Sequence, residues 1–182
     1  MLIQFTVENH RSIKNSAVIS FAASKDKSFE EYLLHPDEKK RLLPVLAIYG
    51  ANAAGKSNVL HAMMTMKEMV VGNAAKVSKG QKLPWEPFGG TKVPTSFEMV
   101  FIFQGVRYTY GFSFNEKKIY KEYLYHWPNG REALIFSREN GVYEFRENVN
   151  EQVTLSNRTP DNKLYLVSSN DWNLPQTENA YQ

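Results

Sequence analysis

The eight residues from Gly50 to Ser57 have the types and spacing of a phosphate-binding site. They read Gly-Ala-Asn-Ala-Ala-Gly-Lys-Ser and fit the pattern G-x-x-x-x-G-K-[ST] at every fixed position. The two glycines let the backbone curl so that successive N–H groups point at one anion. Lys56 places a point charge on the β- and γ-phosphates, and the Ser57 hydroxyl is a hard oxygen ligand suited to Mg²⁺. The pattern predicts a phosphate-binding loop, or P-loop, that holds a nucleotide.

The predicted site includes the residue after the motif, because the helix that begins there adds its N-terminal dipole and free N–H groups. ATP and Mg²⁺ are the predicted cofactors, with Lys56 as the catalytic residue and Ser57 as the metal ligand. The predicted cofactor contacts within the loop are Gly50, Ala51, Asn52, Ala53, Ala54, Gly55, Lys56, Ser57 and Asn58.

The neighbouring segments have the order that a P-loop requires. Residues 43–49 form a short apolar run, which predicts a buried parallel strand. Residues 58–71 repeat apolar side chains at intervals of three and four and stop at Gly72, which predicts a helix. The alternative is a glycine- and alanine-rich turn that only caps a helix, which the preceding apolar strand disfavours.

Composition narrows the class of protein. The chain has 182 residues, 42% of them hydrophobic and 13% aromatic, which suits one domain with a real core. It has no cysteine, which fits a reducing compartment and predicts a cytoplasmic protein. No apolar run is long enough to span a membrane. The net charge of +3 permits contact with nucleic acid without arguing for it.

The pattern of elements predicts an α/β (α+β) fold with a mixed core sheet. Residues 1–71 form the nucleotide-binding core, with strands at 2–7 and 17–21 before the P-loop and a loop with a short helix around 30–34. Residues 72–94, rich in glycine and proline, are interpreted as a long, mobile connection. Residues 95–168 form an antiparallel β subdomain, and residues 169–182 a tail.

Alternating aromatic residues predict the strands of the β subdomain. Phe97 to Phe103 and Tyr108 to Phe114 each place one set of large side chains on one face, which is interpreted as core packing rather than base stacking. In the next strand Ile119, Tyr123, Tyr125 and Trp127 are expected to share a face. Further strands are expected at 132–137, 142–145 and 164–167, while the polar residues 146–163 and the tail carry no predicted element.

The histidines give no metal-binding signal in the sequence. The spacing of His10, His35, His61 and His126 fits no ligand pattern, and His61, on the predicted P-loop helix, is interpreted as a partly buried polar residue.

Two strands before the P-loop and an antiparallel meander after its helix resemble the first lobe of ABC-type ATPases, particularly the SMC, RecF and OLD branch. The opening strand ends in Asn9-His10-Arg11-Ser12, close to the Asn-Phe-Arg-Ser of that branch, and the P-loop has the branch's Asn52 and Asn58. The stretch from Glu122 to Arg138 is similar to a group of bacterial AAA-type ATP-binding proteins, many of them in anti-phage and abortive-infection systems. The likeness covers essentially the whole chain.

The resemblance implies roles for two further residues and for partners. Arg11 would reach toward the nucleotide phosphates, unless it is an ordinary solvated arginine, and Asn52 would sit over the γ-phosphate side of the loop. His10 stands where an aromatic residue is usual and is expected to pack like one. The resemblance also implies a homodimer or higher oligomer and an effector protein, a nuclease or toxin, that ATP hydrolysis would switch. Nucleic acid stays open as a partner, and a membrane is not expected.

Two motifs of these ATPases are missing from the sequence. No apolar strand ending in Asp-Glu follows the P-loop, and no Leu-Ser-Gly-Gly-like signature is present. We therefore expect these residues to be the N-terminal part of a longer protein, with weak phosphate binding and little hydrolysis on their own. The main alternative is a nucleotide sensor or scaffold that binds without turnover and organises a partner protein or DNA. A small kinase fits less well, because it would place its P-loop nearer the start of the chain.

Overall fold

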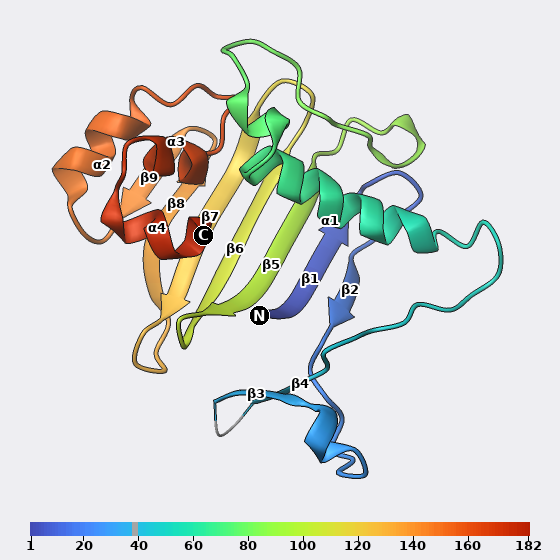
Figure 1. The fold of residues 1–182 in the computed structure, drawn as a ribbon. Coiled ribbons are helices and arrows are strands. Elements are labelled where there is room, and N and C mark those ends of the chain that lie inside the picture. Colours follow the sequence, from blue (N-terminus) through green and yellow to red (C-terminus); the bar gives the residue numbers. More distant parts are fainter. Residues whose placement is uncertain (38–39) are drawn as a thin grey trace.

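The computed structural model describes residues 1–37 and 40–182, and one antiparallel sheet dominates it (Figure 1). All six pairings within the seven-stranded sheet are antiparallel, so the α+β class is confirmed, whereas the predicted mixed sheet is wrong. From one edge to the other the strands are β2 (Ala17–Ser20), β1 (Leu2–Glu8), β5 (Thr95–Phe103), β6 (Val106–Phe114), β7 (Ile119–Trp127), β8 (Ala133–Glu139) and β9 (Val142–Phe145). Because β1 pairs with β5, the first two strands of the chain and the meander share one sheet.

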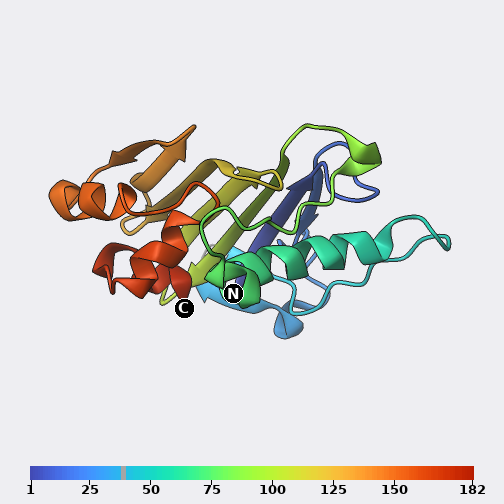
Figure 2. The same cartoon turned by 90° about the horizontal axis from the view of Figure 1, so that it is seen from above.

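Helices cover one face of the sheet, and the core lies between the two layers (Figure 2). The P-loop helix α1 (Lys56–Val70) crosses above β1 and β5 (Figure 1). Near β7 to β9 lie α2 (Val149–Ser156), α3 (Tyr165–Asp171) and α4 (Pro175–Tyr181). Alternation places the aromatic side chains of β5 and β6 in this core, as predicted. No helix in the described ranges is long and apolar enough to cross a membrane.

The predicted parallel strand at 43–49 is wrong. These residues belong to no strand, and Val45 and Tyr49 are 75% and 90% exposed. A buried parallel strand needs neighbours on both sides, because its backbone groups must find partners. In the described ranges the sheet is antiparallel and its edge strands are β2 and β9. The segment instead leads away from the sheet and returns as a long loop to the start of α1 (Figure 1).

The expected phase of β7 is also wrong. Ile119 is in the core, but Tyr123, Tyr125 and Trp127 lie on the other face from Leu124, which is fully buried. The pairing of β6 with β7 shifts register at the start of β7, which inserts one extra residue after Ile119. Such a bulge reverses the inward and outward alternation of every residue that follows.

The predicted last strand at 164–167 is wrong as well, because Tyr165 begins the helix α3. The buried carboxylate of Glu122 accepts hydrogen bonds from the backbone N–H groups of Tyr165 at 2.7 Å and Leu166 at 2.9 Å. The first N–H groups of a helix have no partner within it, so this carboxylate stabilises the helical start. The tail that followed without a predicted element contains α4, and Tyr181 packs against the core.

Three smaller segments complete the chain. The short helix expected around 30–34 is confirmed as a 3₁₀ turn at Glu30–Tyr32, and an unpredicted hairpin of β3 (Leu34–Asp37) and β4 (Lys40–Leu42) follows it. The polar stretch 146–163 contains the unpredicted helix α2. The connection 72–94 has no strand, and its Leu83 is buried in the core.

Candidate nucleotide-binding site

The P-loop lies where the chain turns into α1, as the motif predicts. Gly55 is the residue before the helix and has φ +90°, a left-handed conformation that favours glycine. The Lys56 ammonium group donates hydrogen bonds to the carbonyl oxygens of Gly50 at 2.8 Å and Ala51 at 2.7 Å. An ammonium group has three donors, so one N–H remains for a phosphate oxygen. The lysine thus holds the two ends of the loop together and still presents charge to a ligand.

The two motif glycines are not equivalent. A Cβ on Gly55 would lie 2.9 Å from the Ser12 hydroxyl oxygen, in addition to the strain of its positive φ. A Cβ on Gly50 would make only ordinary contacts, the nearest at 3.8 Å to Lys56. The structure therefore requires glycine at the end of the loop and leaves room for a side chain at its start.

Ser12 contacts the P-loop, a role that no sequence motif predicted. Its hydroxyl oxygen accepts a hydrogen bond of 2.6 Å from the Asn58 side-chain amide, in the first turn of α1. The turn between β1 and β2 therefore rests against the P-loop itself. The remaining loop residues, Ala51 to Ala54 together with Ser57, are exposed and accessible to a ligand.

Arg11 has a different neighbour in this structure. Its guanidinium group forms an ion pair with Glu86, and its backbone N–H donates to the Glu86 carbonyl oxygen at 2.8 Å. The guanidinium lowers the pKa of the Glu86 carboxyl, mainly through the hydrogen bond between them. The proposed contacts of Arg11 and Asn52 with phosphate stay predictions.

Asn9 holds the same turn from the other side. Its side-chain amide donates to the Val93 carbonyl oxygen at 2.5 Å and accepts from the backbone of Phe88 and the hydroxyl of Thr91. The Thr95 hydroxyl donates to the Asn9 backbone carbonyl at 2.6 Å. These contacts join the turn after β1 to the end of the 72–94 connection, so the position of Ser12 is fixed by both segments.

His10 and His61 are in contact, although their spacing in the sequence fits no ligand pattern. The fully buried His10 packs its ring edge-on against Phe97 at 5.4 Å, as expected of an aromatic residue in this place. Its Nε2 lies 3.1 Å from the Nδ1 of His61 on α1. Burial, with a smaller effect of His61, lowers the pKa of His10 to about 4, so the ring is neutral at pH 7. No spacing rule could have found this pair, because the fold brings it together.

A known family matches the chain over a range that includes the P-loop and α1. It is described as "AAA domain, putative AbiEii toxin, Type IV TA system", and the match covers residues 45–151. These residues make up more than half of the 182-residue chain and run from the segment before the P-loop to the start of α2. No curated protein matches the chain.

Proposed function

Because the chain belongs to this family of AAA domains, whose members are nucleotide-binding ATPases, we propose that residues 50–58 bind ATP with Mg²⁺ for hydrolysis. One observation supports the site most directly. The Lys56 ammonium group donates to the carbonyl oxygens of Gly50 and Ala51 and has a third donor left for phosphate. In this proposal the backbone N–H groups of the loop and the start of α1 bind phosphate oxygens, and Ser57 binds the metal.

Hydrolysis needs groups beyond the P-loop. A water-activating carboxylate would come from a second lobe, and a signature segment from a second copy of the protein, as the resemblance to ABC-type ATPases implies. The hydrolysis cycle would switch an effector protein, a nuclease or toxin, in anti-phage defence. The family's description names a type IV TA (toxin–antitoxin) system, which supports a link to a system of this kind.

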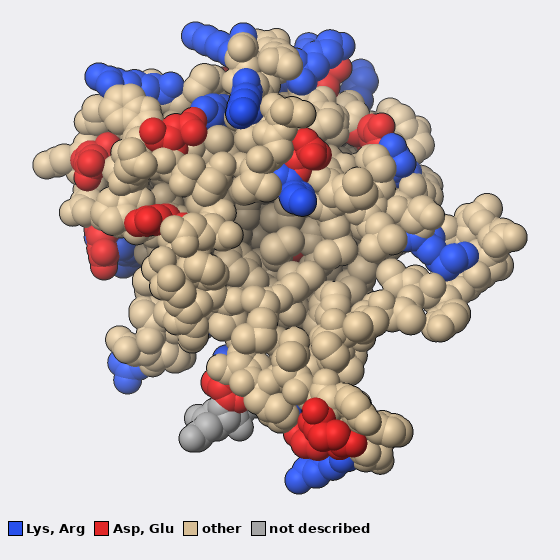
Figure 3. Space-filling model, in the orientation of Figure 1, with Lys and Arg blue, Asp and Glu red and all other residues tan. Residues whose placement is uncertain are grey.

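The second candidate is a nucleotide sensor or scaffold that binds without turnover. A full-length protein without an Asp-Glu strand end after the P-loop would favour it, and one with such a strand end would favour the ATPase. A nucleic-acid partner has less support. On the face drawn in Figure 3, basic and acidic side chains are interspersed, whereas a phosphate backbone is usually met by a single basic stripe.

Equilibrium binding of ATP in the presence of Mg²⁺ tests the proposal. The 182-residue chain is compared with Lys56→Ala and with the matched control Lys67→Ala, which removes an exposed lysine from the end of the same helix. Hydrogen bonds to charged groups contribute about 1.5–3 kcal/mol, so Lys56→Ala should weaken binding by roughly tenfold to a hundredfold. Lys67→Ala should bind like the wild type.

Equal affinities of the wild type and Lys56→Ala, or no binding by either, would contradict the proposed site. Phosphate release by the full-length protein and by its Lys56→Ala variant separates the two candidates. Turnover that depends on Lys56 supports the ATPase, while tight binding without turnover supports the sensor or scaffold.

A further inference from the structure

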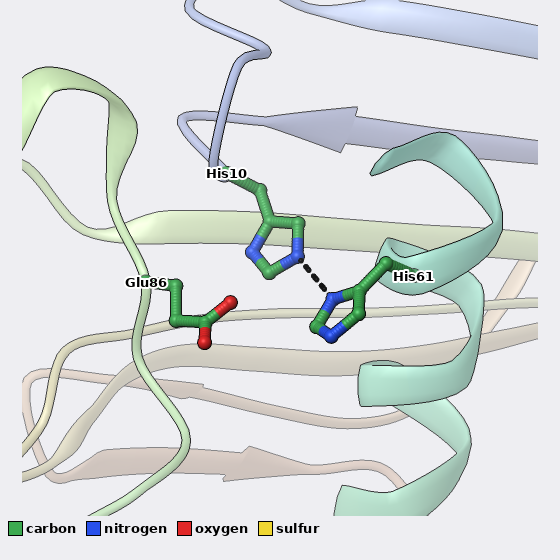
Figure 4. A group of neighbouring side chains, drawn as sticks. All are labelled: His10, His61 and Glu86. Atoms are coloured by element: carbon green, nitrogen blue, oxygen red, sulfur yellow. Dashed lines mark hydrogen bonds between the residues drawn. The ribbon is translucent and has the colours of Figure 1, made fainter. Parts of the chain in front are cut away.

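Three side chains from distant parts of the sequence meet beside the P-loop helix (Figure 4). His10 comes from the turn after β1, His61 from α1, and Glu86 from the 72–94 connection. One ligand atom from each residue lies within 4.8 Å of the other two. This is the one group of three such residues that the described ranges bring so close together.

One nitrogen of the buried His10 ring has no hydrogen-bond partner in the described structure. The two imidazole rings share one hydrogen bond, and the buried His10 Nδ1 has no partner. If His10 donates that bond, its Nδ1 is a lone pair facing the side of the Glu86 carboxylate (Figure 4). If His10 accepts it, Nδ1 carries a buried proton that no group receives. Either tautomer leaves a buried polar atom unsatisfied, which is costly and uncommon in native structures.

The distances in the cluster suit a metal ion. Ligand atoms about 2.0–2.2 Å from a tetrahedral ion lie roughly 3.3 Å from each other. The two imidazole nitrogens are already 3.1 Å apart. The Glu86 side chain is 49% exposed and can close the remaining distance by a change of rotamer. Its ion pair with Arg11 engages one carboxylate oxygen and leaves the other for a ligand role.

We propose that His10, His61 and Glu86 bind a divalent late first-row transition-metal ion, such as Zn²⁺, with a fourth position open to water. Two imidazole nitrogens and one carboxylate oxygen form a donor set that suits this class of ion and not Mg²⁺, which prefers oxygen ligands alone. The site is therefore separate from the proposed Mg²⁺ position at Ser57. It does not depend on nucleotide binding.

An ion bound at this position would affect the P-loop. His61 follows Ser57 by four residues, so the two lie on the same side of α1, one turn apart. His10 precedes Ser12 by two residues, and Ser12 contacts Asn58. An ion held by both histidines would tie the turn after β1 to α1 and keep Ser12 against the P-loop. It would stabilise the fold by an amount that grows with the logarithm of the metal concentration once that concentration exceeds the dissociation constant.

Direct metal binding to the chelator-treated chain tests the proposal. Zn²⁺ affinity is measured by calorimetry, and Co²⁺ is used as a second probe because its visible absorption reports the ligands. We expect one ion per chain. Loss of a ligand should weaken binding at least as much as loss of a residue that hydrogen-bonds to a ligand, by roughly tenfold or more. His61→Gln and Glu86→Gln should both show this loss, and both alter positions that are not fully buried.

Controls separate this site from chance binding and from the nucleotide site. His35→Gln removes an exposed histidine and should leave Zn²⁺ binding unchanged, as should Lys56→Ala, which removes the P-loop lysine but no proposed metal ligand. Thermal unfolding in chelator verifies that each variant is folded. His10→Phe removes the third ligand but keeps an aromatic ring against Phe97. The proposal is overturned if the folded wild type binds no Zn²⁺, or if His61→Gln and Glu86→Gln bind it as tightly as the wild type.

Discussion

Asn58 donates a hydrogen bond of 2.6 Å to the hydroxyl oxygen of Ser12, which joins the first turn of the P-loop helix to the turn between β1 and β2. Ser12 also lies where a side chain on Gly55 would have to go. The P-loop is therefore supported from outside by a residue far away in the sequence. Its shape depends on this contact as well as on its own glycines.

The first prediction concerns this contact. Ser12→Ala removes the acceptor and should weaken ATP binding by roughly fivefold, since a neutral hydrogen bond contributes about 1 kcal/mol. Asn58→Ala should have a similar effect, and the double variant should be no worse than either, because the two residues act as one pair. Ser16→Ala, an exposed serine at the end of the same turn, is the control. Strictly additive losses in a double-mutant cycle would show that the pair does not act as a unit.

The second prediction distinguishes the two motif glycines. Gly55→Ala should destabilise the protein by about 1–2 kcal/mol, because an alanine there meets Ser12 and adopts a left-handed φ of +90°. Gly50→Ala should cost far less, because its Cβ has room. Denaturant unfolding and ATP binding of the two variants measure the difference. A larger loss of ATP affinity for Gly50→Ala than for Gly55→Ala would mean that the loop changes conformation when nucleotide binds.

The sequence predicted the elements in which the spacing of apolar residues alone reveals the buried face. The alternating aromatics of β5 and β6 and the spacing of α1 are features of this kind, since one face of each is buried in the same core. The segment 43–49 fails for the opposite reason. An apolar run becomes a parallel strand only when other strands pair with it, and its own residues do not specify those strands.

The features that were not predicted depend on how segments distant in the sequence pair and pack. One extra residue near the start of β7 turns Glu122 inward and Tyr123 outward, and no periodicity reveals it. Glu122 then caps α3, so a run that reads equally well as strand or helix becomes a helix. In the site, the P-loop was predictable from its motif. The roles of Ser12 and of the pair of His10 and His61 follow only from how the turn after β1 docks on α1.

The third prediction tests the cap on α3. Burial raises the pKa of Glu122, while the backbone N–H groups of α3 and the nearby Arg138 oppose that rise. Glu122→Gln keeps the size of the side chain but turns one acceptor into a donor that faces a backbone N–H. We expect a loss of about 1–3 kcal/mol in the free energy of unfolding. The exposed Glu139→Gln in the next strand is the control. A more stable Glu122→Gln would mean that the cost of the buried charge outweighs the cap.

The fourth prediction concerns Arg11. If its guanidinium group leaves Glu86 for the phosphates when nucleotide binds, Arg11→Ala should weaken ATP binding by roughly tenfold. Glu86→Gln should strengthen it, because the arginine is then released from its ion pair. Both affinities are measured with Mg²⁺ in buffers free of transition metals. If Arg11→Ala binds ATP as tightly as the wild type, Arg11 does not contact the phosphates. Its role is then limited to its contact with the 72–94 connection.

The last prediction concerns the exposed segment before the P-loop. In the described ranges, residues 45–49 take part in no strand pairing, and Val45 and Tyr49 are largely exposed. Hydrogen exchange of these backbone amides should therefore be fast, whereas β6, between two paired strands, and the middle of α1 should exchange slowly. Mass spectrometry at two protein concentrations makes the measurement. Protection at 45–49 that matches β6 at low concentration would contradict the exposed conformation. Protection that develops only at high concentration would show that a second copy of the chain covers the segment.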